Sequence, residues 1–201
     1  MIRVLLAEDQ RILLEALATL LALESDMEVV ATVETGDAIV PAALEHRPDV
    51  AVIDIDLPVT DGITAAAALR ERLPACATVI LTALARPAHL KRALAAGVGG
   101  FLPKETTPEN LAEAIRKVRA GERVVDQRLA LAALEAPESP LTPREAEILR
   151  LLASGADAAK IAADLFLSEG TVRNYLASAV TKLNARNRLD AVRIAGDAGW
   201  L

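Results

Sequence analysis

Carboxylates stand where two apolar runs of the chain end. Glu8 and Asp9 directly follow the run 2–7, and Asp54 follows the run 50–53. If these runs are neighbouring parallel strands, the three carboxylates meet at one sheet edge, where each pair repels by roughly 4 kcal/mol at an effective dielectric constant of about 20. A cation should relieve that repulsion, and oxygen ligands without His or Cys suit Mg²⁺. The pattern therefore predicts a magnesium site.

Two polar side chains of another kind follow two later apolar runs. Thr82 comes after the run 79–81, and Lys104 comes after the run 101–103. A hydroxyl and an ammonium group that face a metal-bound carboxylate can orient a transferring phosphoryl group and neutralise its charge. Taken singly, an Asp after a strand is most often a helix N-cap or a turn residue, and a lone Lys is usually solvated. Their joint placement at strand ends favours phosphoryl chemistry.

Five apolar runs alternate with stretches of helical spacing in residues 1–120. This alternation predicts a five-stranded parallel sheet with helices on both faces, whose ligands bind beyond the carboxyl ends of the strands. The runs are continuously apolar, as expected for strands that are buried on both sides. The expected strands are 2–7, 28–33, 50–53, 78–81 and 100–102, and the expected helices are 12–23, 37–46, 63–73, 87–96 and 108–120.

The chain changes character after residue 120. Residues 121–140 are expected to be a linker that contains a strand-like piece and one short helix, and that ends in the proline-rich, polar stretch 136–140. From residue 141 onward the β-branched runs vanish, and helices are expected at 143–153, 158–164, 168–183 and 188–198. Thr142 and Ser168 are predicted N-caps, and Gly155 is a predicted helix stop. Residues 141–201 are therefore predicted to form an all-helical second domain.

Charge divides the chain at the same place. The net charge is −6, but residues 1–140 hold 14 basic and 21 acidic side chains, whereas residues 141–201 hold eight and seven. No apolar stretch reaches the roughly 18 residues that a membrane span needs, and the N-terminus turns acidic at Glu8 before a signal-peptide pattern develops. We therefore expect a cytoplasmic protein without membrane insertion. Cys76 is the only cysteine, which excludes an intramolecular disulfide.

The expected helix 168–183 has two different faces. One face is apolar and consists of Val172, Leu176, Ala179, Val180 and Leu183. The opposite face holds Gly170, Arg173, Asn174, Ala177 and Thr181. Arg and Asn side chains fit guanine and adenine edges in a major groove, and Lys182, Arg186 and Arg188 lie beyond them, where phosphates are expected. The alternative is a helical interaction domain with an ordinary solvated face.

Residues 1–120 resemble the receiver domain of two-component response regulators, which has a doubly wound, flavodoxin-like α/β fold. The resemblance implies that Asp54 is the phospho-acceptor and that the switch and catalytic residues are Thr82, Phe101 and Lys104. It also implies a magnesium ion held by Glu8, Asp9, Asp54 and the backbone carbonyl of Asp56. The Asp56 side chain is not expected to be a ligand. Asp61-Gly62 matches the family's turn into the next helix.

Two positions depart from the receiver pattern, and one rival family shares part of it. Leu57 stands where methionine is common, and Pro103 removes a possible hydrogen-bond donor of the sheet just before Lys104.

Haloacid-dehalogenase-type phosphatases also carry Asp-x-Asp after an apolar strand, here Asp54-Ile55-Asp56. That family usually places the pair near the N-terminus and follows it with a threonine. This chain has Leu57 there, at mid-domain, with an acidic pair upstream.

Residues 141–201 resemble the LuxR/NarL-type helix-turn-helix, a four-helix module that binds double-stranded DNA. The resemblance implies DNA contacts by Thr171, Arg173, Asn174, Lys182, Arg186 and Arg188. Ala177 falls where some members carry a basic residue, so the target sequence of another member cannot be transferred to this chain.

Together the two resemblances imply a phosphorylation-switched transcriptional regulator of the NarL type. A sensor histidine kinase would phosphorylate Asp54, and Phe101 would turn inward. The phosphorylated chain would bind DNA as a homodimer, through either the first and fifth receiver helices or the face of the fourth helix and fifth strand. It would not be an enzyme beyond its own phosphoryl transfer and dephosphorylation. A constitutive regulator that dimerises without phosphorylation is the alternative.

A finer resemblance rests on three short strings. They are 7–10, 85–87 and 170–175, and they are similar to those of regulators of membrane-lipid desaturation that are paired with a thermosensing kinase. This similarity implies a role in a membrane-lipid or temperature response.

Overall fold

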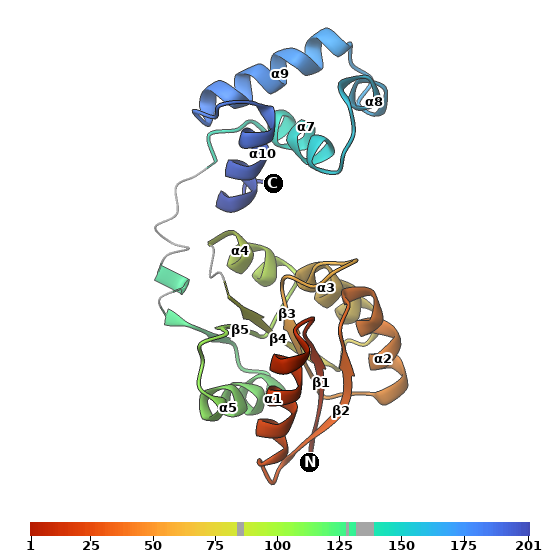
Figure 1. Ribbon diagram of the computed structural model, residues 1–201, viewed down its shortest axis with the longest axis vertical. Coiled ribbons are helices and arrows are strands. Elements are labelled where there is room, and N and C mark those ends of the chain that lie inside the picture. Colours follow the sequence, from red (N-terminus) through yellow and green to blue (C-terminus); the bar gives the residue numbers. More distant parts are fainter. Residues whose placement is uncertain (84–86, 128, 132–138) are drawn as a thin grey trace. The chain divides into compact units, whose positions relative to one another are not determined.

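The computed structural model describes residues 1–83, 87–127, 129–131 and 139–201 (Figure 1). The chain divides into two compact units, an N-terminal one that ends at Leu131 and a C-terminal one made mainly by the residues after it. No helix within these described ranges is long and apolar enough to cross a lipid bilayer.

The N-terminal unit is built on a parallel sheet with the strand order β2-β1-β3-β4-β5-β6. The predicted α/β fold is confirmed, but the expectation of five strands was one too few. Val124 and Val125 pair with Gly100 and Phe101 and add a sixth strand. Two residues are too few to show a periodic pattern. The strands are β1 (Ile2–Ala7), β2 (Met27–Val33), β3 (Val50–Asp54), β4 (Ala77–Thr82), β5 (Gly100–Pro103) and β6 (Val124–Val125).

Helices cover both faces of this sheet. They are α1 (Arg11–Ala22), the short 3-10 helix η1 (Gly36–Ala38), α2 (Ile39–His46), α3 (Gly62–Arg72), α4 (Pro87–Ala95) and α5 (Pro108–Arg119). Helices α1 and α5 lie side by side (Figure 1) and bury Val4 and Leu6 of β1 against one face. Because side chains alternate along a strand, Leu5 and Ala7 point to the other face. Both faces are therefore buried, and the strands consist of continuous apolar runs.

Within residues 139–201, the C-terminal unit contains the four helices that the sequence predicted. They are α7 (Pro143–Ala153), α8 (Ala158–Asp164), α9 (Glu169–Lys182) and α10 (Arg188–Ala198). Thr142 and Ser168 accept hydrogen bonds as N-caps of α7 and α9, as expected. Gly155 follows α7 at φ +92°, a conformation that glycine adopts without strain. All four helices contribute to one core, which includes Ile148, Leu149, Ile161, Val172 and Ala191.

The stretch between the two units is described only in part. Its strand-like piece is β6, and the amide of Ala130 donates to the carbonyl of Asp126 in a helical spacing. Residue 128 and residues 132–138 lie outside the described residues. The expected linker helix and most of the stretch 136–140 therefore fall partly or wholly on residues that the structure does not describe.

Candidate functional site

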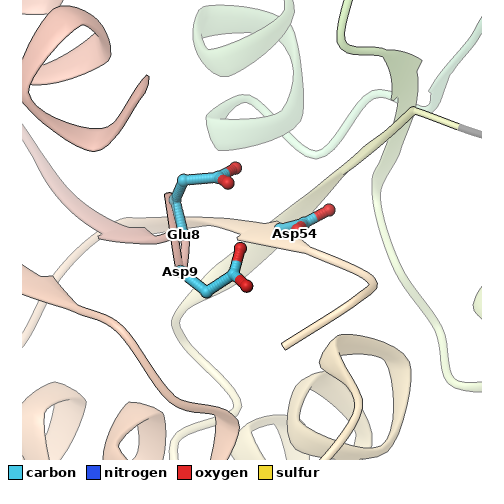
Figure 2. A group of neighbouring side chains, drawn as sticks. All are labelled: Glu8, Asp9 and Asp54. Atoms are coloured by element: carbon cyan, nitrogen blue, oxygen red, sulfur yellow. The ribbon is translucent and has the colours of Figure 1, made fainter. Parts of the chain in front are cut away.

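Three carboxylates meet at the carboxyl edge of the sheet. Glu8 and Asp9 follow β1, and Asp54 ends β3, which pairs with β1. One carboxylate oxygen from each residue lies within 4.8 Å of the others (Figure 2). Glu8 and Asp54 are buried, each with 2 % of its surface exposed, while Asp9 is exposed. The expected acidic constellation therefore exists, and the β1–β3 pairing produces it.

Lys104 supplies positive charge to this pocket. Its Nζ lies 2.7 Å from Glu8 Oε2 and 3.0 Å from Asp54 Oδ2, and only 13 % of its side chain is exposed. Burial lowers the pKa of Lys104, but the two carboxylates outweigh it, so the pKa is raised overall and the ammonium stays charged. Burial also raises the pKa of Glu8, against the opposing effect of Lys104. Lys104 brings one positive charge to a group of three carboxyl side chains, so it can balance the charge of only one of them.

The pocket has the chemistry of a divalent-cation site. Its ligands are oxygens, and Asp54 Oδ1 is buried without a hydrogen-bond partner among the described residues. A buried carboxylate oxygen left unpaired costs free energy, which a hard cation such as Mg²⁺ would recover. The Asp56 side chain is exposed and lies outside this carboxylate group, as expected for a residue that would contribute only its carbonyl.

The two predicted switch side chains lie on the neighbouring strands. Thr82 ends β4 one residue beyond Leu81, the partner of Asp54, and it is fully buried. Phe101 lies in β5, and 1 % of its surface is exposed, so its ring is already inside. Pro103 does not interrupt the local ladder, because the Lys104 amide donates to the Thr82 carbonyl at 2.9 Å.

The loop after Asp54 is held by close backbone packing. The Gly62 amide donates to the Ile55 carbonyl, and a Cβ at Gly62 would lie 1.9 Å from the Asp54 carbonyl oxygen. Asp61 caps α3 and pairs with Arg92 of α4 at 2.9 Å. Val59 adopts φ +70° with its side chain exposed, a costly conformation for a β-branched residue. Sequence patterns did not reveal the Arg92 contact.

Helix α9 presents the predicted polar face. Val172, Leu176 and Ala179 are buried, whereas Gly170, Arg173, Asn174, Ala177 and Thr181 are exposed. Arg173 keeps 67 % of its side chain exposed while it pairs with Glu169 one turn earlier. The Thr171 hydroxyl lies 2.8 Å from Ser168 Oγ, so it already has one hydrogen-bond partner at the start of α9.

The three basic residues predicted to contact phosphates differ in their surroundings. Arg188, the first residue of α10, is exposed. Arg186 has 82 % of its side chain exposed and pairs with the buried Asp190. Lys182 donates to Glu145 Oε2 at 2.7 Å, and only 3 % of the Glu145 side chain is exposed. Lys182 therefore joins α9 to α7, a role that the sequence analysis missed.

Comparison with known families covers both units. The model of the response regulator receiver domain matches residues 4–116, and that of the bacterial regulatory proteins of the luxR family matches residues 139–195. The chain belongs to the response-regulator family with a LuxR-type DNA-binding domain. The N-terminal unit is thus a receiver, and the C-terminal unit is the DNA-binding module.

Full-length relatives share the arrangement of this regulator. It is 44 % identical over 201 residues to the transcriptional regulatory protein YvfU of Bacillus subtilis (strain 168), covering 100 % of both chains. It is 42 % identical over 200 residues to the transcriptional regulatory protein DesR of the same organism, covering 100 % of this chain and 99 % of DesR. A solved structure of two RcsB dimers bound to two parallel DNAs matches with a TM-score of 0.68 at 25 % identity, covering 98 % of each chain.

Proposed function

We propose that this regulator is switched by transfer of a phosphoryl group to Asp54 from a sensor histidine kinase. The observation that supports this most strongly is the buried Asp54 carboxylate, whose Oδ2 pairs with Lys104 and whose Oδ1 has no hydrogen-bond partner in the part of the chain that the structure describes. In the transfer, an Asp54 oxygen would form a bond to phosphorus as the P–N bond of the donor breaks. Glu8, Asp9, Asp54 and the Asp56 carbonyl would hold Mg²⁺, which would neutralise charge on the transferring phosphoryl group.

The residues around Asp54 suit the modified state. Phosphorylation adds about −1.5 to −2 charge and new acceptor oxygens. Lys104 would exchange its bond to Asp54 for one to a phosphoryl oxygen, and the Thr82 hydroxyl, at the end of the adjacent strand, would donate another. The buried position of Phe101 resembles the inward state that we expected after phosphorylation.

DNA recognition would follow from α9. Arg173 and Asn174 would read base edges, with Arg186 and Arg188 on phosphates. We place the regulator in the cytoplasm, where a kinase and DNA are both accessible. We propose no enzymatic activity beyond its own phosphoryl transfer and dephosphorylation. The role in a membrane-lipid or temperature response stays a prediction.

The test is intact-mass measurement after incubation with acetyl phosphate and Mg²⁺. The wild-type chain is expected to gain one phosphoryl group, and Asp54→Asn is expected to gain none, because Asn lacks the nucleophilic carboxylate. A wild-type chain that takes up no phosphoryl group from acetyl phosphate or a kinase would support constitutive dimerisation instead. Repeated release of phosphate from a small ester would support the phosphatase alternative.

The proposed dimer surface lies on α1. Ile12, Ala16 and Leu20 recur every four residues on its exposed side, and Ile12 is 88 % exposed. They line a shallow depression together with Glu15 and Thr19. Pairing through β5 is less favourable because β6 covers its edge. These observations favour the face of α1 over the face of α4 and β5, between which the sequence could not choose.

Substitution at Ile12 tests this surface. Phosphorylated wild type is expected to run as a dimer in light scattering, whereas Ile12→Asp is expected to stay monomeric and still gain a phosphoryl group, because a charge cannot be buried unpaired in an apolar contact. Leu94→Asp is the matched control on α4, where Leu94 is 39 % exposed. Loss of the dimer in Leu94→Asp alone would place the interface on the α4 side.

A further inference from the structure

Asp190 is a buried carboxylate that no recognised DNA contact explains. It lies in the first turn of α10 with 7 % of its side chain exposed. Its Oδ2 accepts from the Arg186 backbone amide at 3.1 Å and from Arg186 Nε at 3.0 Å, and its Oδ1 lies 3.3 Å from Arg186 Nη2. The carboxylate therefore binds both the backbone and the guanidinium of one arginine.

Further bonds fix Asp190 itself. Asn187 Oδ1 accepts from the Asp190 amide at 2.9 Å. Arg193 Nη2 donates to Asp190 Oδ1 at 3.0 Å, and Arg193 Nη1 donates to Asp197 at 3.0 Å. The hydrogen bonds from Arg186, and then the one from Arg193, lower the pKa of Asp190, so the carboxylate remains ionised at neutral pH. The acceptor that faces Arg186 is therefore charged and well fixed.

Arg186 itself remains accessible. It lies in the turn between α9 and α10, and 82 % of its side chain is exposed although three of its nitrogens face Asp190. Thr181, in the last turn of α9, and Asn184, just after the helix, are also exposed. An arginine on a flexible stem loses rotamer freedom when it binds a phosphate, and an arginine that is already oriented loses less.

We propose that Asp190 is a positioning residue for DNA binding, which holds the Arg186 guanidinium oriented at the end of α9 so that it contacts a backbone phosphate. This proposal rests on the proposed role of α9 in DNA recognition. The effect that it predicts for the Asp190 carboxylate on DNA affinity has the opposite sign to the one expected from charge alone. A carboxylate near DNA should weaken binding by repulsion, whereas a positioning carboxylate strengthens it.

The experiment uses the full chain and a labelled duplex of mixed sequence, about 30 base pairs long, titrated at several salt concentrations. Asp190→Asn is expected to bind about fivefold more weakly than wild type, and its slope of log K against log salt is expected to be shallower by about one unit, as for one lost phosphate contact. Tighter binding, or an unchanged slope, would overturn the proposal.

Two further variants show whether Asp190 acts by positioning Arg186, by its charge alone or by stabilising the fold. Asp197→Asn makes the same charge change on the same helix, at a residue that contacts Arg193 but for which no contact with Arg186 is described, and it is expected to bind no more weakly than wild type. In an Arg186→Ala background, Asp190→Asn is expected to have no further effect. An equal loss in that background would show that Asp190 acts by another route, such as the stability of α10.

Two further measurements keep the result interpretable. If Asp190→Asn is poorly folded, Arg186→Lys replaces it, because Arg186 is exposed. Lysine keeps the positive charge but lacks the planar guanidinium with its fixed set of donors, so this variant is also expected to bind DNA more weakly than wild type. Equal binding by Arg186→Lys would contradict the need for orientation. A wild-type chain that does not bind DNA would instead refute the proposed function.

Discussion

Gly62→Ala is expected to abolish phosphoryl uptake at Asp54 and to lower the free energy of unfolding of the receiver by about 3 kcal/mol. The new Cβ would lie 1.9 Å from the Asp54 carbonyl oxygen and 2.9 Å from Ile53 Cγ2. A backbone oxygen cannot rotate away, so β3 or α3 must shift. Because β3 ends in Asp54, the shift moves the acceptor relative to Lys104. Intact mass with acetyl phosphate and hydrogen exchange of β3 peptides in urea measure the two effects.

Gly196→Ala is the matched control for this change. Gly196 lies in α10, and beyond the backbone of its own helix no atom of the described residues lies within 4 Å of the position of a Cβ, so alanine there is expected to stabilise the helix slightly and to leave phosphoryl uptake unchanged. Normal labelling of Gly62→Ala would mean that the β3–α3 loop tolerates displacement, and that Asp54 does not need this packing.

Glu145→Gln is expected to destabilise the DNA-binding module by about 3 kcal/mol at pH 7. Although burial opposes it, donors from Lys182, Ser178 and Thr142 lower the pKa of Glu145 to about 2. An acid whose pKa is lower in the folded state stabilises that state above its unfolded pKa. The wild-type module should therefore lose the same stability as the pH falls from about 4.5 to about 2. The glutamine variant should show a much flatter dependence over this range.

The chain offers a selective probe and a control for this prediction. Trp200 is the only tryptophan and packs against the core of the C-terminal unit, so its fluorescence in urea reports on that unit. Glu147→Gln removes an exposed partner of Arg144 on the same helix and should change the stability by less than about 1 kcal/mol. Equal urea midpoints for the two variants would show that the buried contacts of Glu145 contribute little.

Local patterns predicted most of the fold and the acidic pocket. Continuous apolar runs marked the buried strands, and parallel pairing brought Glu8 and Asp54 together at their ends. N-caps such as Thr142 and Ser168 are short-range signals, so the bounds of α7 and α9 were predicted closely.

Contacts between distant residues were missed. Glu145 and Lys182 are 37 residues apart, and nothing in either segment indicates their pairing, so Lys182 was interpreted only as a phosphate contact. The contact between Asp190 and Arg186 spans only four residues, but it was missed as well, because it depends on how the turn between α9 and α10 folds. The strand-like piece that became β6 was predicted, but its place in the sheet was missed, because only its pairing with β5 shows it.

The N-terminal unit continues past strand β6 to Leu131, and this fixes the point from which the DNA-binding module is tethered. Leu141 belongs to the core of the module, and residues 132–140 join the two units. A chain of that length reaches at most about 35 Å when fully extended. Half-sites one helical turn apart on DNA are separated by about 34 Å. Two receivers that pair would thus confine two modules within reach of adjacent half-sites, and raise their effective local concentration without any new contact to DNA.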